Sequence, residues 1–320
     1  MTRIVNVAAA QLGPIQNSHS KKEVVERLVQ LMIDAKKMGC DLIVYPELAL
    51  TTFFPRWYAE NIADFDHYYE KSMPNADTQI LFDTAQKLGI GFYLGYAELE
   101  QSSQGTHRYN SAILVSQQGQ IIGKYRKVHL PGHAENEPWR RFQHLEKYYF
   151  EYGQSFDIWD AFGGRFGMAL CNDRRWSETY RVMGIQGAEM ILLGYNTPVH
   201  NPPAPEHDDL SMFHNHLVMQ AGAYQNGTWV IGVAKAGNEE NCEMIGGTCI
   251  IAPSGEIVAA CSTKGDELAI ARCDLDLCHS YKNTTFNFEK HRRPEAYGLI
   301  TSQRGVIKPA SPVQKIESLN

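Results

Sequence analysis

The chain has 320 residues and a formal net charge of −6; 43% of its residues are hydrophobic and 21% are charged. This balance is typical of a globular protein with enough apolar residues to bury a sizeable core. Proteins that bind nucleic acid or an anionic membrane leave a basic patch in the sequence, and none stands out here. We therefore expect neither a nucleic-acid nor a membrane partner.

The N-terminal segment and the cysteines bear on the compartment. Residues 3–10 are typical of a strand and lead directly to the polar Gln11, without the charged start, apolar run and cleavage site of a signal peptide. No apolar run approaches the ~20 residues that cross a bilayer. The seven cysteines are irregularly spaced and include no C-x-x-C, so neither disulfides nor cysteine-type zinc sites are favoured. The sequence predicts a cytoplasmic protein with reduced thiols.

Strand-like apolar runs alternate with helical patterns along the chain. Val24, Leu28, Leu31, Met32 and Ala35 have the i, i+3/i+4 spacing of one helix face. Further helices are expected at 80–88, 178–186 and 210–224, and strands at 5–10, 42–45, 91–97, 111–115, 167–170, 190–193, 229–233, 249–251 and 268–271. Gln-Gly at 118–119 and Ser-Gly at 254–255 predict hairpin turns. This order indicates an α/β fold in which helices cover the sheets.

No linker, repeat or low-complexity tract interrupts the chain. We predict a single domain over residues 1–300 and a polar C-terminal tail over residues 301–320. Two long polar loops, 129–147 and 195–209, lie between expected elements. Long loops beside strand ends often carry function, so both loops are candidates for the site.

Cys171 directly follows the apolar strand that ends at Leu170, and Ser177 is a candidate N-cap of the next helix. A strand–turn–helix junction exposes the side chain at the strand's end, as in a nucleophile elbow. A helix N-terminus and the neighbouring Arg174 and Arg175 would stabilise a thiolate against its reference pKa of about 8.5. We interpret Cys171 as a candidate nucleophile, although buried cysteines are more often structural.

Glu47 and Lys127 follow the same logic at two other strand ends. Glu47 comes after the apolar run 42–45 and Pro46, and its burial there would raise its pKa and make it a general base. In 123–131, strand alternation places Lys127 on the inner face and Lys124 on the outer face. A buried ammonium is suited to stabilising a developing oxyanion.

Three segments in this order resemble the signature motifs of the nitrilase superfamily. They are YPE at 45–47, YRKVHL at 125–130 and LCND at 170–173. The resemblance implies a four-layer αββα sandwich with two mixed sheets, a catalytic Glu47–Lys127–Cys171 triad and assembly into homodimers or homotetramers. Glu146 is implied as a second carboxylate at the site; the plain alternative is a surface glutamate paired with Lys147.

A closer resemblance is to the N-carbamoyl-D-amino acid amidohydrolases of that superfamily. It covers the chain up to about residue 299 and is carried by segments 46–57, 129–133, 142–147, 171–176, 194–198 and 200–203. It implies hydrolysis of N-carbamoyl-D-amino acids to D-amino acid, ammonia and carbon dioxide through a cysteine-bound intermediate.

A substrate of this kind carries a carboxylate, which a guanidinium binds through two parallel hydrogen bonds. Because adjacent residues rarely face the same way, we expect one of Arg174 and Arg175 to bind the substrate and the other to be structural. The Asn172 backbone N–H is expected to help Lys127 stabilise the oxyanion. Further candidate substrate contacts are Asn172, Asn196, Thr197, His129 and His144; the two histidines are equally consistent with a structural role.

Two other enzyme classes stay open as alternatives, and a non-catalytic binding protein on this fold is disfavoured because all three triad residues are present. The first is another enzyme of the same superfamily: an aliphatic amidase, a nitrilase or a β-ureidopropionase. The second is a metal-dependent amidohydrolase that uses His207, Asp208, His214 and His216. The two-residue spacing of His214 and His216 differs from the i, i+4 pair of a helical zinc site, so we expect no metal and no cofactor.

Overall fold

The computed structural model describes residues 2–308. The chain divides into a large unit that ends at Phe286 and a small unit that begins at Asn287. The described part of the small unit contains α7 (Phe288–His291), η5 (Pro294–Ala296) and α8 (Gly298–Ser302). Of the tail predicted for 301–320, residues 309–320 lie outside the described residues.

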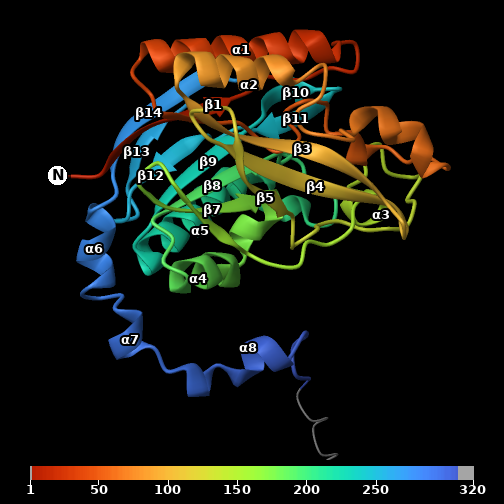
Figure 1. The fold of residues 1–320 in the computed structure, drawn as a ribbon. Helices are drawn as coiled ribbons and strands as arrows, with labels where there is room; N and C mark the ends of the chain where they lie inside the picture. The colour runs from red at the N-terminus through yellow and green to blue at the C-terminus, as the bar shows by residue number, and fades with distance from the viewer. Residues whose placement is uncertain (1, 309–320) are drawn as a thin grey trace, which may run out of the picture. The chain divides into compact units, whose positions relative to one another are not determined.

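Two six-stranded mixed sheets form the centre of the large unit (Figure 1). The order of the first is β14-β1-β2-β3-β4-β5, in which β1, β2 and β3 are parallel and the remaining neighbours are antiparallel. Its strands are β1 (Ile4–Gln11), β2 (Leu42–Val44), β3 (Gly91–Ser102), β4 (Gly105–Val115), β5 (Ile121–Arg126) and β14 (Glu267–Asp274).

The order of the second sheet is β13-β12-β9-β8-β7-β6, with β7, β8 and β9 parallel. Its strands are β6 (Ile158–Ala161), β7 (Gly164–Leu170), β8 (Met190–Tyr195), β9 (Trp229–Ala234), β12 (Cys249–Ile251) and β13 (Ile257–Ala260). A separate hairpin pairs β10 (Ala236–Glu239) with β11 (Cys242–Ile245). Each sheet therefore has a parallel centre and antiparallel edges.

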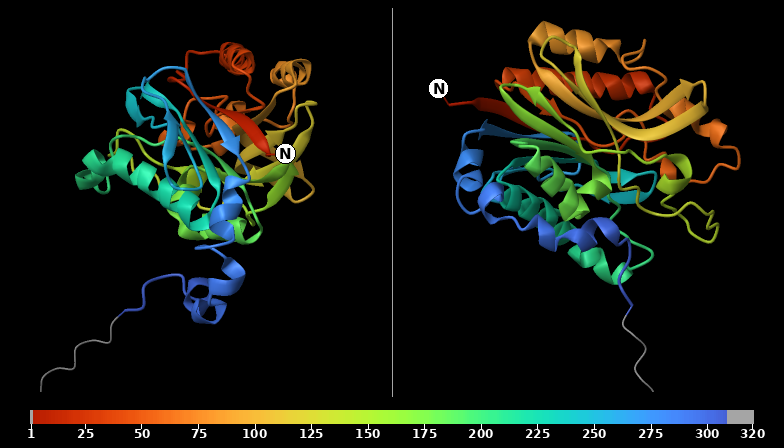
Figure 2. Two further views of the ribbon diagram at one scale, coloured as in Figure 1. Left: turned by 90° about the vertical axis from the view of Figure 1, so that its left-hand side faces the viewer. Right: turned by 60° about the horizontal axis from the view of Figure 1, so that its bottom comes forward.

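Helices cover the outer faces of both sheets, as the views of Figure 2 also show. The helices α1 (Lys21–Lys37) and α2 (Gln79–Leu88) lie over the first sheet, and α4 (Ser177–Ile185) and α5 (Ser211–Asn226) lie over the second. The remaining helical segments of the large unit are η1 (Phe54–Arg56), η2 (Ile62–Tyr68), α3 (Glu146–Tyr149), η3 (Cys171–Arg175), η4 (Pro205–Leu210) and α6 (Leu277–Lys282). The expected four-layer α/β sandwich with two mixed sheets is confirmed.

Three apolar cores separate the layers. In β1, Val7 packs between the two sheets whereas Ala8 faces α1, so this strand is buried on both sides. A strand that is buried on both faces has a continuous apolar sequence rather than an alternating one. The inner core contains Leu42 and Tyr93 of the first sheet and Met168, Leu192 and Ile231 of the second. Both sheets are thereby fixed face to face, and the loops at their strand ends converge.

The expected helices at 80–88, 178–186 and 210–224 match α2, α4 and α5 to within two residues at each end, and the predicted helix face at 24–35 lies within α1. All five residues of the predicted helix face, from Val24 to Ala35, are buried. The hairpins at 118–119 and 254–255 are confirmed by the antiparallel pairs β4–β5 and β12–β13. One cap prediction was wrong, since Ser177 is the first residue of α4 and Trp176 takes the N-cap position.

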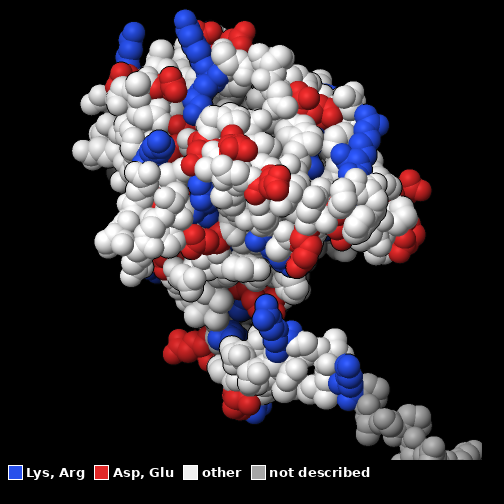
Figure 3. Space-filling model, turned by 90° about the vertical axis from the view of Figure 1, so that its right-hand side faces the viewer, with Lys and Arg blue, Asp and Glu red and all other residues white. Residues whose placement is uncertain are grey.

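On the face shown in Figure 3, Lys and Arg side chains are interspersed with Asp and Glu side chains. Within residues 2–308, no helix combines the length and the apolar character needed to cross a membrane.

Candidate active site

The candidate residues lie where strands of the two sheets end. Glu47 follows β2, Lys127 follows β5, Cys171 follows β7 and Asn196 follows β8. The carboxyl ends of the parallel neighbours β7 and β8 open on one edge of the second sheet, and Glu47 after β2 meets this edge, because its Oε2 lies 3.0 Å from the Asn196 backbone nitrogen. Clefts at the carboxyl ends of parallel strands are where α/β proteins place their ligands.

Two glycines make room for Glu47 between the sheets. A Cβ at Gly95 of β3 would lie 2.7 Å from the Glu47 Cα, and a Cβ at Gly194 of β8 would lie 2.5 Å from the Glu47 backbone nitrogen. Both distances are far below van der Waals contact, so a larger residue at either position would displace the Glu47 backbone. Glu47 itself is fully buried.

Lys127 joins two carboxylates in the buried space. Its Nζ lies 2.7 Å from Glu47 Oε1 and 2.6 Å from Glu146 Oε2, and all three side chains are fully buried. The predicted alternation is confirmed: Tyr125 is buried, whereas Lys124 and Arg126 form ion pairs with Glu98 at the sheet surface. Glu146 therefore lies at the site and is not a surface glutamate paired with Lys147.

The pKa values within this cluster diverge. Burial raises the pKa of Glu47, and the Glu146 charge adds to that rise while Lys127 opposes it. For Glu146, burial is outweighed by Lys127 and His144, so its pKa is lowered. Burial alone would lower the pKa of Lys127, but the two carboxylates raise it, and Lys127 stays an ammonium. Two carboxylates with divergent pKa values are suited to different roles, Glu47 as a base and Glu146 as a fixed charge.

Cys171 is the first residue of η3 and lies at a sharp turn directly after β7. Its φ of +44° lies in the left-handed region that non-glycine residues rarely adopt, as expected for a nucleophile elbow. Its Sγ donates to Asn196 O at 3.3 Å. The expected thiolate stabilisation was wrong: burial first, and then the Glu47 charge, raise the pKa of Cys171 despite Lys127 and Arg174. The resting residue is a thiol that needs a base.

Arg174 and Arg175, which follow Cys171, differ in their burial and in their partners. Arg174 is 1% exposed, and its guanidinium donates to Asn215 Oδ1, Cys171 O and Thr197 Oγ1 at 2.9, 2.7 and 2.8 Å. Arg175 is exposed, and no carboxylate in the described chain lies within ion-pair distance of it. Its pKa is lowered to about 10, chiefly by the positive charge of Arg174, so it stays cationic at neutral pH.

Asn196 links the base and the thiol. Its backbone N–H donates to Glu47 Oε2 at 3.0 Å, and its side chain donates to Glu47 O at 2.9 Å. The same residue accepts the Cys171 thiol through its carbonyl. Thr197 is used to hold Arg174, and the Asn172 side chain donates to His129 O at 3.2 Å. Asn172, Asn196 and Thr197 therefore connect parts of the site to one another.

The two candidate histidines hydrogen-bond to buried carboxylates. His144 Nε2 lies 3.0 Å from Glu146 Oε1, and His129 Nδ1 lies 2.9 Å from Asp173 Oδ1. Asp173 also accepts from the backbone N–H groups of His129 and Leu170 and from the Tyr125 hydroxyl. It thereby ties the Cys171 elbow to the loop that follows Lys127.

Sequence reasoning missed several residues that build the site. Asp173 and Tyr125 lay inside recognised motifs but were given no role. Asn110 of β4, which donates to Glu47 Oε1 at 2.8 Å, and Asn215 of α5 carry no local signal, because each meets the site only through the folding of distant segments.

The alternative of a metal-dependent amidohydrolase was based on His207, Asp208, His214 and His216. His200 pairs with Asp208 at 2.7 Å, and His216 Nε2 lies 3.2 Å from Gly247 O. His207 and His214 are in edge-to-face ring contact. In residues 2–308 there is no group of three or more His, Cys, Asp or Glu side chains arranged to hold a metal ion.

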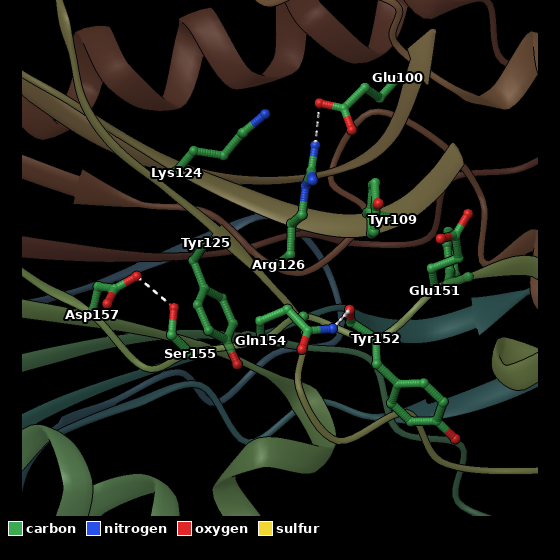
Figure 4. A pocket seen from close by; sticks show the side chains of 12 residues that line it. Glu100, Tyr109, Lys124, Tyr125, Arg126, Glu151, Tyr152, Gln154, Ser155 and Asp157 are labelled. Atoms are coloured by element: carbon green, nitrogen blue, oxygen red, sulfur yellow. Dashed lines mark hydrogen bonds and ion pairs between the residues drawn. The ribbon is translucent and has the colours of Figure 1, made fainter. Parts of the chain in front are cut away.

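A pocket of about 700 Å³ opens elsewhere, between β5 and the segment that follows α3 (Figure 4). Tyr109, Tyr125 and Tyr152 lie among its lining residues. Its basic side chains, Lys124 and Arg126, are already paired with Glu98 and Glu100. None of Glu47, Lys127 and Cys171 lines it, so it is distinct from the candidate active site.

A buried Glu–Lys–Glu cluster beside an elbow cysteine is suited to hydrolysis through a covalent intermediate, and comparison with known proteins gives the family. The carbon-nitrogen hydrolase family model matches residues 6–283. The chain belongs to the carbon-nitrogen hydrolase family. It is thus an enzyme of the nitrilase superfamily, as its three motifs indicated.

Among curated relatives of this carbon-nitrogen hydrolase, three show what it resembles. An N-carbamoylputrescine amidase of Solanum lycopersicum is 29% identical, with 95% of this chain and 97% of the relative covered. A nitrilase of Pyrococcus abyssi is 28% identical, with 92% and 99% covered. A citrullinase of Francisella tularensis is 28% identical, with 92% and 98% covered.

The fold of this carbon-nitrogen hydrolase is also found among solved structures. The crystal structure of a carbon-nitrogen hydrolase from Helicobacter pylori G27 superposes with a TM-score of 0.80 at 21% identity, covering 94% of this chain and 99% of that one. The comparison bears on the architecture alone.

Proposed function

We propose that the chain hydrolyses N-carbamoyl-D-amino acids to D-amino acid, ammonia and carbon dioxide. The observation that carries this proposal is Arg175, a solvent-exposed residue near Cys171 whose guanidinium has no carboxylate partner among the described residues. Since the Arg174 charge lowers the pKa of Arg175, an anion that binds there relieves repulsion between two cations. A substrate carboxylate supplies that anion and accepts both N–H groups of the fork.

The carbamoyl part of the proposal is supported by the relatives, two of which are an N-carbamoylputrescine amidase and a citrullinase. The D configuration rests on the resemblance of segments 46–57, 171–176 and 194–203 to N-carbamoyl-D-amino acid amidohydrolases. Assembly into a homodimer or homotetramer stays a prediction from the same resemblance.

In the proposed mechanism, Glu47 takes the proton of the Cys171 thiol, and Sγ attacks the ureido carbon. Glu47 Oε2 accepts one backbone N–H, from Asn196, and has a further lone pair for that proton. Lys127 donates to Glu47 and Glu146, and its third N–H has no acceptor within residues 2–308. That N–H and the Asn172 backbone N–H stabilise the oxyanion.

The leaving nitrogen then takes the proton from Glu47, and the C–N bond breaks to give a thioester-level intermediate on Cys171. Water attacks this intermediate and gives a proton to Glu47, which returns it to the sulfur. Whichever nitrogen leaves first, the carbamic acid that is released loses carbon dioxide, so the products are the same. Glu146 keeps its charge and holds Lys127 in place.

The test is a panel of substrates with ammonia release as the readout. We expect turnover of N-carbamoyl-D-amino acids to exceed that of the L-enantiomers, of N-carbamoylputrescine, of simple amides and of nitriles, and to vanish in Cys171→Ala. Preferred turnover of N-carbamoylputrescine, amides or nitriles would keep the family and refute the proposed substrate.

A further inference from the structure

Asn110 contacts all three charged residues of the buried cluster. Its Nδ2 donates to Glu47 Oε1 at 2.8 Å and approaches Glu146 Oε2 at 3.4 Å. Its backbone carbonyl accepts the Lys127 backbone N–H at 2.9 Å. Asn110 is fully buried in β4, where it pairs with Ala97 of β3. Asn110 thus contacts the Glu47 and Glu146 carboxylates through its side chain and the backbone of Lys127 through its carbonyl.

The orientation of the Asn110 amide follows from its neighbours. Carboxylates accept hydrogen bonds, so the NH2 group faces Glu47 and Glu146, and the amide oxygen must point away from them. That oxygen, Oδ1, is buried and has no hydrogen-bond partner. An unsatisfied buried acceptor destabilises a fold, so this asparagine is not explained by stability alone.

We infer that Asn110 is a positioning residue that holds the Glu47 and Glu146 carboxylates in contact with the Lys127 ammonium. Two carboxylates that share one lysine repel each other, and a neutral donor between them reduces that repulsion without adding charge. The inference rests on the proposed role of Glu47 as the general base. Its consequence is that Asn110 keeps Glu47 available in the charged form at lower pH.

The other groups that act on Glu47 are identified by the structure. Lys127 follows β5, Glu146 begins α3 and Cys171 follows β7. Tyr93 of β3 and Lys235 after β9 also interact with the Glu47 charge. Loss of the Asn110 N–H leaves these groups in place, so the pKa of Glu47 should rise, since a hydrogen bond to a carboxylate favours its charged form.

The test follows alkylation of Cys171 by iodoacetamide with mass spectrometry as a function of pH, which requires no knowledge of the natural substrate. In the wild type, the rate should rise through an acid limb as Glu47 loses its proton. In Asn110→Leu, and in Asn110→Val, which suits a strand, this limb should move upward by about one pH unit, while the rate above the limb is retained. Neither leucine nor valine has a side-chain hydrogen-bond donor. Each also leaves little space for a water molecule that could replace the Asn110 amide.

Asn226 gives a matched control, since it is 1% exposed, donates to Gly222 O at 2.9 Å and has an unpartnered Oδ1. Asn226→Leu should leave the limb where it is. An unshifted limb in either folded Asn110 variant, or an equal shift in Asn226→Leu, would overturn the inference. Glu47→Gln distinguishes failure of the Asn110 inference from failure of the proposed base. If the acid limb persists in Glu47→Gln, the limb does not report ionisation of Glu47, and the proposed role of Glu47 as the general base is refuted.

Discussion

Replacing Arg175 with lysine tests whether a carboxylate clamp selects the substrate. In the proposed complex the guanidinium makes two parallel hydrogen bonds to the substrate carboxylate, and an ammonium cannot reproduce this fork. Loss of one charge-assisted hydrogen bond weakens substrate binding by about 1.5 kcal/mol, which corresponds to about a tenfold rise in KM. Arg175→Ala loses both bonds and should raise KM by roughly a hundredfold. Because Arg175 does not touch the reacting atoms, kcat should change little in the lysine variant.

The assay compares kcat and KM for an N-carbamoyl-D-amino acid and for the matching urea without the carboxylate. The wild type should have a much lower KM for the carboxylate substrate than for the matching urea. In Arg175→Lys, this difference in KM between the two substrates should become smaller. The melting temperature should stay unchanged, since Arg175 has no ion-pair partner among the described residues.

Arg272 of β14 is an exposed arginine away from the candidate site, and Arg272→Lys provides the control. Equal KM values for wild type and Arg175→Lys would refute the clamp. So would comparable kcat/KM for the carboxylate substrate and the plain urea in the wild type.

Three further outcomes are expected. Arg174→Lys should lower the melting temperature by roughly 5 °C, because an ammonium loses about two of the three buried hydrogen bonds that the guanidinium donates to oxygen atoms, and a calorimetric midpoint equal to wild type would contradict this. Cys171→Ala should abolish ammonia release while circular dichroism and the melting temperature stay native; residual full activity would disprove the nucleophile. EDTA should leave the rate unchanged, since Lys127 supplies the oxyanion stabilisation, and reactivation of a chelated, inactive sample by zinc or manganese would instead favour a metal among His207, Asp208, His214 and His216.

The sequence was sufficient for the residues that lie at the ends of apolar strands. Glu47 and Cys171 each follow a run that is buried on both faces, and such runs are recognisable without a structure. Lys127 was assigned by two-residue alternation, which needs only the phase of one strand. The short edge strands β6 and β13 were not predicted, because each has only four residues and neither is buried on both faces like the strands of the parallel centre.

The sequence was insufficient where the chemistry depends on contacts between distant segments. The donor Asn110 lies 63 positions from the carboxylate that it contacts, and nothing near it in the sequence points to that carboxylate. The division of labour between Arg174 and Arg175 depends on Asn215 and Thr197, which belong to α5 and the loop after β8. The pKa of Cys171 was predicted in the wrong direction for the same reason, since burial and Glu47 outweigh the nearby cations.

The raised pKa values of Glu47 and Cys171 are consistent with one proton shared within a closed cluster. At rest the cluster holds the Lys127 cation, the Glu47 and Glu146 anions and a neutral thiol, for a net charge of about −1. When the proposed mechanism moves the thiol proton to Glu47, the negative charge moves to sulfur and the total does not change. No ion has to enter or leave a region where isolated charges are strongly destabilised. Burial by itself disfavours formation of the thiolate. In the proposed proton transfer, however, the thiolate forms as the buried Glu47 carboxylate loses its charge, so part of this cost is offset.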